Sequence, residues 1–304
     1  MSTISSSDSE IAVETIRVYV GTDRSQMLAC DVLEHSIKRH TNAKVELVPM
    51  LELPIPLPQD PKNYPRTGFS FARFCIPKLA GYQGKAIYMD ADMMVFKDIR
   101  SMWNLPLNGA KIMIQNEQVL RGSHGQTKKK RQCSVMLMDC GALDWDVRRI
   151  VQDLDEQKYT YSELMSELCI LSDEEIATRL PDTWNHLDQY NPETCLLHFT
   201  NMHRQPWMSS LHPLAEVWFD EVRLMLANGT LTWARIQKDI DDGYLRPSLI
   251  RDIQTGHKLP RSIRFLFNWY NQASDYLKGY RKHSVFYQLL KASREQGQQQ
   301  RSVS

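Results

Sequence analysis

The chain has 304 residues, 42% hydrophobic and 24% charged, and its 37 basic and 36 acidic residues leave a net charge of +1 at pH 7. A chain of this length can bury a core without disulfides, and near-zero net charge argues against a dedicated nucleic-acid-binding protein. The six cysteines form no Cys-x-x-Cys pair and fit a reducing cytoplasm, and no uncharged apolar stretch approaches the ~20 residues that span a bilayer.

Residues 1–14 are Ser-rich and acidic, and they lack the basic start and apolar run of a secretion signal. We therefore expect a disordered leader there. The pattern further along predicts an α/β domain at 15–215 and a helical region at 216–295. The polar stretch 296–304 is expected to be a disordered tail.

The first predicted unit is a strand at 16–21, a helix at about 26–40 and a strand at 43–50. In sheets built from such βαβ units, ligands bind beyond the carboxyl ends of the strands. Thr22 and Asp23 follow the first strand and so lie where a ligand is expected. A helix N-cap explains the same two residues equally well.

A proline-rich loop at 53–65 precedes the segment 68–79, which is predicted to be a helix. Arg73 lies in this segment among Phe69, Phe71 and Phe74. Burying a guanidinium there is costly without an anionic partner. The guanidinium either contacts a ligand, such as a phosphate or a sugar ring, or forms a structural ion pair within the protein.

Asp90 and Asp92 occupy the end of an apolar run, 86–96, that is predicted to be a buried strand. Residues two apart in a strand point to the same side. Two carboxylates beside an apolar core share a proton or bind a cation, and a hard divalent cation with oxygen ligands is the simplest solution. A turn or a helix cap is the common alternative for an isolated Asp-x-Asp.

The middle of the chain alternates short elements. A helical turn at 99–103, strands at 110–115 and 132–139 and a helix at 145–154 are expected. The connection 118–131 ends in the run Lys128–Arg131. We expect a polar, mobile connection, either a solvated loop or a lid that closes on an anionic ligand.

Ser172 and Glu175 have the spacing of a capping box, which accounts for the acidic residues there. A short apolar strand then ends at His198, and the chain breaks at Pro206 and Trp207. A lone histidine at a strand end is usually a satisfied core or loop residue. It also suits a third metal ligand.

From residue 258 to 291 the chain alternates basic and aromatic residues. Such a pattern suits an interfacial segment that contacts anionic lipid headgroups from the inner face of a membrane. A helix packed on the main domain with a solvated basic face is the alternative.

Taken together, these residues resemble glycosyltransferase family 8, which includes glycogenin and bacterial lipooligosaccharide galactosyltransferases. The resemblance covers about residues 16–210 and rests on motifs in the family's order: Thr22-Asp23, Phe71-Ala-Arg73, Tyr88-Met-Asp90-Ala-Asp92, Asp173-Glu174-Glu175 and His198 followed by Pro206-Trp207. It implies a GT-A fold: a Rossmann-like, mixed but mainly parallel sheet flanked by helices, here with a C-terminal helical appendix.

The resemblance also implies an activity, the retaining transfer of a hexose from UDP-glucose or UDP-galactose, with Mn²⁺ or Mg²⁺ at the site. The acceptor would be a saccharide, a lipid-linked sugar or a small molecule. Carried over by position, Asp90, Asp92 and His198 would hold the metal. The donor would contact Thr22, Asp23, Arg73, Ala91 and Arg204, and the reacting sugar would lie beside Gln132, Asp173 and Glu174.

The chain departs from the family's His-x-x-Gly-x-x-Lys-Pro-Trp element. Its version, 198–207, is one residue longer, with Asn201 at the glycine position and Gln205 before the proline. The usual lysine is absent, so Arg204 or the Lys128–Arg131 run is the expected source of positive charge.

Two other functions compete with this prediction. A nucleotidyltransferase also uses carboxylates and a metal, but it normally opens with a Gly-rich phosphate loop, and the turn after the first strand has one glycine, Gly21. A non-catalytic nucleotide-sugar-binding protein is the second alternative, and the missing lysine is the argument for it.

Overall fold

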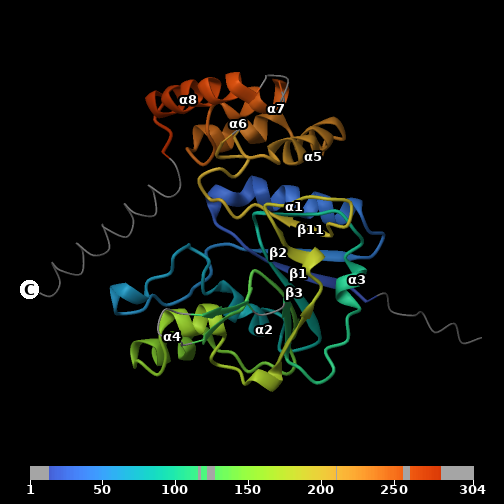
Figure 1. The fold of residues 1–304 in the computed structure, drawn as a ribbon, viewed down its shortest axis with the longest axis vertical. Coiled ribbons are helices and arrows are strands. Elements are labelled where there is room, and N and C mark those ends of the chain that lie inside the picture. The colour runs from blue at the N-terminus through green and yellow to red at the C-terminus, as the bar shows by residue number, and fades with distance from the viewer. Residues whose placement is uncertain (1–13, 116–117, 122–126, 210, 256–260, 282–304) are drawn as a thin grey trace, which may run out of the picture.

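The computed structural model describes residues 14–115, 118–121, 127–209, 211–255 and 261–281. Most of the predicted leader, all of the tail at 296–304 and parts of the 258–291 segment lie outside these ranges. Figure 1 shows a layer of C-terminal helices above the helix α1, with the strands of the main sheet below α1.

The main sheet has six strands in the order β2-β1-β3-β8-β5-β9. All neighbouring pairs are parallel except those made by β8, which runs antiparallel to both β3 and β5. The sheet is therefore mixed and mainly parallel, as predicted. The strands are β1 (Ile16–Gly21), β2 (Val45–Met50), β3 (Lys85–Asp90), β5 (Ile112–Gln115), β8 (Val135–Asp139) and β9 (Ile176–Leu180).

Both faces of this sheet are covered, which explains why its central strands read as continuous apolar runs. Alternate residues of β3 point to opposite faces: Ile87 packs toward α1 (Met27–Arg39) and α3 (Arg100–Trp103). Tyr88 packs on the other side, in the cluster that includes residues of α2 (Ile76–Leu79) and α4 (Val147–Asp155). A charge anywhere in the middle of β3 would be buried.

A second, three-stranded sheet begins where β3 ends. Its order is β10-β11-β4, with β10 (His186–Leu187), β11 (Leu196–His198) and β4 (Met93–Val95). The chain leaves the main sheet after Asp90 and enters the small one at Met93, so Asp90 to Asp92 form the corner between two sheets. This corner positions both carboxylates.

Three segments differ from the sequence-based expectations. The connection at 118–131, predicted as a polar, mobile connection without strands, contains a hairpin in which β6 (Gln118–Arg121) pairs antiparallel with β7 (Thr127–Lys130). Within 68–79, only a 3-10 turn and the one-turn helix α2 form, and Pro77 stands in the first turn of α2, where its missing N–H has no intrahelical partner to lose. The capping box of Ser172 and Glu175 is confirmed, but it begins a single 3-10 turn that leads straight into β9.

The remaining short helical turns are Arg24–Gln26, Pro61–Asn63, Ala72–Cys75, Glu163–Glu167 (a π-helical turn), Asp173–Glu175 and Asp182–Asn185.

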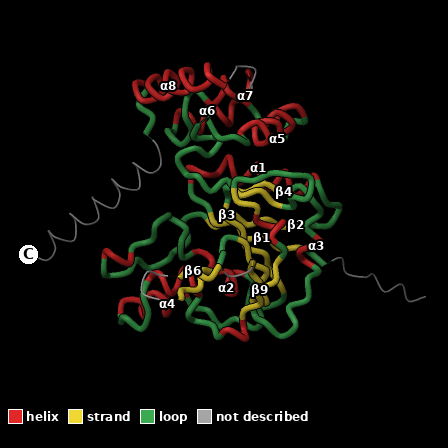
Figure 2. Tube along the Cα trace, in the orientation of Figure 1, coloured by secondary structure: helices red, strands yellow, loops and turns green. Residues whose placement is uncertain are grey.

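Four C-terminal helices form the upper layer seen in Figures 1 and 2: α5 (Ala215–Ala227), α6 (Trp233–Asp241), α7 (Leu249–Thr255) and α8 (Arg261–Leu277). Helices α5, α6 and α7 share one hydrophobic cluster with the main domain, which includes Trp218 of α5, Val32 of α1 and Leu197 of β11. The helical region therefore depends on the main domain for part of its core. No helix among the described residues is both long and apolar enough to cross a bilayer.

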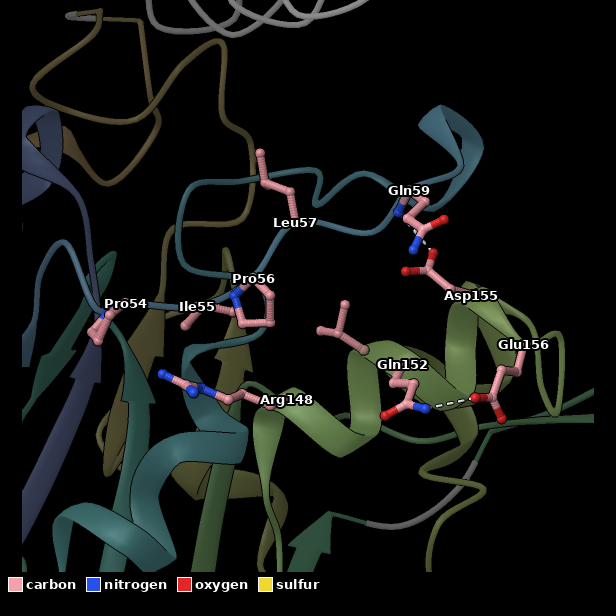
Figure 3. A pocket seen from close by; sticks show the side chains of 10 residues that line it. Pro54, Ile55, Pro56, Leu57, Gln59, Arg148, Gln152, Asp155 and Glu156 are labelled. Carbon is pink, nitrogen blue, oxygen red and sulfur yellow. Dashed lines mark hydrogen bonds between the residues drawn. The ribbon is translucent and has the colours of Figure 1, made fainter. Parts of the chain in front are cut away.

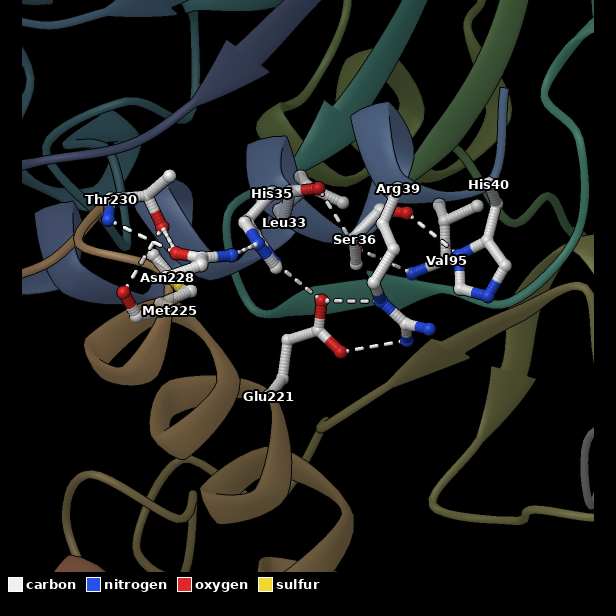
Figure 4. Close-up of polar contacts among 10 residues, drawn as sticks. All are labelled: Leu33, His35, Ser36, Arg39, His40, Val95, Glu221, Met225, Asn228 and Thr230. Carbon is white, nitrogen blue, oxygen red and sulfur yellow. Dashed lines mark hydrogen bonds and ion pairs between the residues drawn. The ribbon is translucent and has the colours of Figure 1, made fainter. Parts of the chain in front are cut away.

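A buried carboxylate fastens this layer to α1 (Figure 4). Glu221 of α5 is 3% exposed and accepts hydrogen bonds from Arg39 Nε at 3.0 Å and Arg39 Nη2 at 2.8 Å. His35 Nδ1 lies 2.6 Å from the same carboxylate. Because removing one partner would leave a buried charge uncompensated, this contact fixes how α5 sits on α1.

Candidate metal and donor site

The corner between the two sheets is held by backbone hydrogen bonds from three strands. Asp90 N donates to Ser134 O at 3.2 Å, just before β8, and Ala91 N donates to Gly21 O at the end of β1, at 3.0 Å. On the other side, Phe199 N donates to Asp92 O at 2.9 Å. The corner is therefore fixed by secondary structure rather than by a flexible loop.

Asp90, Asp92 and His198 meet at this corner. One ligand atom from each lies within 4.8 Å of the other two, and His198 Nε2 is 3.1 Å from Asp92 Oδ1. Antiparallel pairing of β11 with β4 places His198 opposite Met93 and so beside Asp92, although over a hundred residues separate them in sequence. The structure brings together the three residues that the sequence predicted as metal ligands.

The donor set fits a divalent cation. Two carboxylates and one imidazole suit Mn²⁺ or Mg²⁺ with further oxygen ligands from a substrate or water. Asp92 Oδ1 is buried and, among the described residues, accepts no hydrogen bond from outside the cluster; it faces His198 Nε2 at 3.1 Å, so a cation could contact both atoms. The cluster therefore has both the residue types and an unused acceptor that metal binding requires.

Electrostatics at the corner point the same way. Burial raises the pKa of Asp90; Arg73 opposes this and Asp92 adds to it. Burial alone would lower the pKa of His198, but the carboxylates of Asp92 and Asp90 raise it above its ordinary value. The cluster of Asp90, Asp92 and His198 therefore favours bound positive charge. A metal cation supplies this charge without protonating any of the three side chains.

Arg73 lies against this cluster. It is 8% exposed, its Nη1 donates to Cys133 O at 2.8 Å, and its guanidinium stands 4.9 Å from the centre of the Tyr88 ring. Arg73 Nε has no hydrogen-bond partner among the described residues. Burial lowers the pKa of Arg73, but Tyr88 and Asp90 raise it to a net increase, so the guanidinium stays charged. An anionic ligand at the corner would meet this charge.

The Tyr88 hydroxyl donates to Asp90 Oδ1. Burial, partly opposed by Arg73, holds the pKa of Tyr88 well above its ordinary value, so the phenol keeps its proton and remains a donor. Gly21 makes room for this contact: a Cβ at Gly21 would come within 2.5 Å of the Tyr88 hydroxyl and 2.8 Å of Phe69 Cδ2. Sequence reasoning gave neither Tyr88 nor Gly21 a role in the site.

Asn185 is a further contact that the sequence did not predict. Its amide nitrogen donates to Gln115 Oε1 at 2.8 Å and Ser134 Oγ at 3.1 Å, so its oxygen faces His198 Nδ1, 3.0 Å away. His198 must then donate from Nδ1, which leaves Nε2 to bind a metal. Asn185 lies in a 3-10 turn with no motif of its own, so no local pattern in the sequence indicates its contact with His198.

The remaining donor-site predictions fall on the same edge of the sheet. Thr22 is buried directly after β1, and Asp23 caps the next turn by accepting from Ser25 N at 2.8 Å, as the N-cap interpretation expected. Ala91 is buried between the two aspartates, and Gln132 is half-buried two residues before Ser134. Their contacts with a donor remain predictions.

The two arginines predicted as sources of positive charge, Arg204 and Arg131, have different environments. Arg204 is exposed in the turn after His198, and its backbone N–H donates to Asn201 O at 2.8 Å. Arg131 is buried, pairs with Asp173 and donates to Glu167 O at 2.6 Å. Arg131 is therefore engaged with the segment 163–173 rather than available in a mobile lid.

Asp173 and Glu174 are not brought to the cluster. Glu175, which follows them, is level with Lys111 before β5, at the amino end of the parallel strands, whereas Asp90 ends β3 at the opposite edge. Since β9 lies three strands from β3, the lateral separation alone is roughly 14 Å. Strand β9 follows these acids at once, and the side chain of Asp173 pairs with Arg131.

A separate hollow of about 810 Å³ lies between the proline-rich loop and α4 (Figure 3). Its walls include Ile55, Leu57, Arg148 and Asp155, and Gln59 N bridges the two sides by donating to Asp155 Oδ1 at 2.8 Å. None of the predicted site residues lines it.

The chain is similar in sequence to known proteins. Residues 57–189 match the sequence model of Glycosyl transferase family 8. The chain is 25% identical over 228 residues to Protein CDI of Arabidopsis thaliana, an alignment covering 68% of this chain and 85% of that protein.

Two solved structures share the fold. Galactosyltransferase LgtC, crystallised with donor and acceptor sugar analogues, superposes with a TM-score of 0.51 at 11% identity, over 68% of this chain and 95% of its own. The glycosyltransferase GlyE of Streptococcus pneumoniae gives a TM-score of 0.51 at 18% identity, over 77% of this chain but 65% of its own. The chain thus spans about two thirds of GlyE.

The sheet, the acidic corner and these matches define the class: the protein is a glycosyltransferase with a GT-A fold. Residues 57–189 are similar to Glycosyl transferase family 8, the family that its motifs resemble.

Proposed function

We propose that the protein is a metal-dependent, retaining hexosyltransferase that uses a UDP-sugar, UDP-glucose or UDP-galactose, and transfers the hexose to a saccharide, a lipid-linked sugar or a small molecule. One observation carries the proposal: Asp90, Asp92 and His198 converge at the carboxyl edge of the sheet, with the charged Arg73 beside them. This is where α/β folds of this kind bind ligands.

The chemistry asks the site to stabilise a departing diphosphate. Mn²⁺ or Mg²⁺ bound by Asp90, Asp92 and His198 would supply positive charge next to the phosphates. Arg73 adds a fixed cation that is already desolvated and needs no rearrangement, which is the form of electrostatic stabilisation that acts most strongly in a buried site. Thr22 and Asp23 would contact uridine, and Gln132 would contact sugar hydroxyls.

Retention is proposed to proceed by front-face displacement, in which the leaving phosphate takes the proton of the acceptor hydroxyl. No carboxylate of the chain forms a bond to the sugar in this scheme. Asp173 and Glu174 were expected to orient the sugar, but their place at the far edge of the sheet argues against direct contact.

UDP release from a panel of UDP-hexoses, with manganese and with chelator, tests the proposal. We expect release with one or two hexoses that stops with chelator and falls at least 100-fold in Asp92→Asn. Release that chelator leaves untouched would rule out the metal assignment. UDP-sugar binding without any release, with or without a panel of acceptors, would favour a non-catalytic binding protein.

We also propose that α8 contacts a membrane surface. Its outward face carries large apolar side chains that are each more than half exposed: Phe265, Leu266, Trp269, Tyr270, Tyr276 and Leu277. The face turned toward the protein is polar, with Asn268, Asn271 and Asp275 buried. This polarity is the reverse of an ordinary surface helix.

The charges around the outward face of α8 favour an anionic lipid surface as its partner. Arg251 stands 5.1 Å from the centre of the Phe267 ring, and Arg281 stands 3.9 Å from that of Tyr276, so cations rim the aromatic surface. The one acid of α8, Asp275, is buried and accepts from Ser248 N at 2.8 Å. A cytoplasmic protein bound at the inner membrane face would present cations and aromatic rings in this way.

Co-sedimentation with vesicles tests this contact. The protein should pellet with vesicles containing phosphatidylglycerol but not with pure phosphatidylcholine, and Leu266→Ser with Trp269→Ser should abolish pelleting. Leu224→Ser, on an exposed apolar residue of α5, is the matched control and should pellet normally. A stable dimer in solution that the α8 double variant dissociates would instead make this face a contact between two copies.

A further inference from the structure

Gln205 stands before Pro206 and Trp207, where the family pattern has lysine, and it is 2% exposed. Its amide Nε2 donates to Asp92 Oδ2 at 2.8 Å and to Phe199 O at 3.0 Å. One side chain therefore ties a predicted metal ligand to the strand end that carries His198.

The two oxygens of Asp92 are treated differently. Oδ2 is engaged by Gln205, whereas Oδ1 is buried, lies 3.1 Å from His198 Nε2 and accepts no hydrogen bond from the other residues that the structure describes. A carboxylate with one oxygen held is restricted in rotation, so its other oxygen keeps a fixed direction. That direction is toward the group formed with Asp90 and His198.

A neutral amide suits this task better than an ammonium. It holds the carboxylate by a hydrogen bond without cancelling its charge, whereas a lysine in contact with Asp92 would pair with that charge and compete with a cation.

Gln205 is itself firmly placed. Arg246, 3% exposed, donates from Nε to Trp207 O at 3.1 Å and from Nη2 to Pro206 O at 3.2 Å, and it pairs with Asp252 of α7 at 2.5 Å. The C-terminal helices thereby fix the backbone that presents Gln205.

We propose that Gln205 is a positioning residue that holds Asp92 with one oxygen turned toward the cation, which rests on the proposed metal-dependent function. The residue before Pro206 then has a different role from the family's lysine. It supplies no charge, and it orients Asp92 as a metal ligand.

Mn²⁺ binding to the purified full-length protein, followed by electron paramagnetic resonance without any donor, tests the proposal. Gln205→Met keeps the side-chain length and removes the donor, and we expect Mn²⁺ to bind about 10- to 100-fold more weakly. If Gln205→Met does not fold, Gln205→Asn, whose amide is too short to reach both acceptors, should give the same loss.

Two further variants separate the possible causes. Ser209→Ala loosens the same segment, since Ser209 Oγ lies 3.0 Å from Asn268 Oδ1, but it does not touch Asp92 and should leave the Mn²⁺ affinity unchanged. Asp92→Asn should abolish binding. Wild-type protein that binds no Mn²⁺ would contradict the proposed function itself.

A different result overturns this inference alone. If wild-type protein binds Mn²⁺, Asp92→Asn does not, and Gln205→Met binds as wild type while melting at a lower temperature, Gln205 only supports the fold.

Discussion

At the scale of single residues, the site depends on neutral groups that orient charged ones. Tyr88 donates to Asp90, Asn185 accepts from His198, and Gln205 donates to Asp92. Each predicted ligand thus has a partner that is uncharged at neutral pH, so the cluster keeps its negative charge while its geometry is fixed.

Gly21→Ala tests the packing beneath this arrangement. The added methyl would displace the Tyr88 hydroxyl or Phe69, so we expect a loss of about 1–3 kcal/mol in unfolding free energy and a clear loss of UDP release. Gly141→Ala is the control, because its Cβ would meet nothing closer than 3.4 Å. Urea unfolding and the UDP-release assay report the two effects. Equal behaviour of both variants would show that Gly21 has no special packing role.

Asn185→Leu tests the orientation of His198. The variant removes the acceptor of His198 Nδ1–H and leaves Gln115 Oε1 without its donor, so Mn²⁺ should bind about 10- to 100-fold more weakly. Isothermal titration with Mn²⁺ measures the change. Asn191→Ala, which removes an exposed loop contact to Glu193 N, should bind as wild type. Unchanged affinity in Asn185→Leu would mean that His198 is oriented by β11 alone.

At the scale of elements, strand placement decides which acids can act. Five strands of the main sheet, β1, β2, β3, β5 and β8, were predictable because each reads as a largely apolar run. The place of Asp173 and Glu174 was not, because no local signal in the sequence shows that strand β9 begins at Ile176.

Glu174→Gln should therefore keep full UDP release and transfer. The acid is exposed and precedes β9 at the edge of the sheet opposite Asp90. Steady-state kinetics beside Asp92→Asn provide the comparison. A loss of more than tenfold in kcat for Glu174→Gln would restore its role beside the sugar and show that the 163–175 segment moves during turnover.

The contact between α1 and α6 predicts a pH dependence of stability. Burial raises the pKa of Asp31 to about 6, from an unfolded value of 3.8; Arg235 opposes the shift and Asp239 adds to it. The folded state therefore binds more protons, and stability from protonated Asp31 is full below pH ~3.8 and lost as pH rises through about 6.

The side chain introduced by Asp31→Asn cannot ionise. The unfolding free energy of this variant should therefore exceed that of the wild type increasingly as pH rises through this window, by on the order of 2 kcal/mol above pH 7. Urea unfolding at several pH values measures the difference. Glu46→Gln, at an exposed position of β2, serves as control. A constant difference between wild type and Asp31→Asn from pH 4 to 8 would show that Arg235 fully compensates the charge.

At the scale of the whole molecule, the C-terminal helices are connected to the corner that carries Asp90 and Asp92. Arg246 joins α7 to the backbone of Pro206 and Trp207, and Gln205 continues the connection to Asp92. The exposed apolar face of α8 lies on this same helical layer. A surface bound by α8 would therefore rest on the layer that supports the site.

The sequence predicted this organisation unevenly. Apolar periodicity indicated most of the longer strands and helices, and motifs shared with the family pointed to Asp90, Asp92 and His198 as candidate metal ligands. Asn185 and Gln205 lie in irregular segments, where an isolated polar residue has no pattern that distinguishes a buried contact from a solvated one. The inward polar face of α8 depends on partners in distant segments, such as Ser248, and so could not be read from its own sequence.

The central claim is that Asp90, Asp92 and His198 bind one cation beside the donor phosphates. Crystals soaked with Mn²⁺ and UDP, measured at the manganese absorption edge, test it directly. We expect one anomalous peak within ~2.0–2.6 Å of a ligand atom from each residue, with the diphosphate next to it. UDP bound at this edge with no peak, or a peak that lacks His198 or either aspartate, would contradict it.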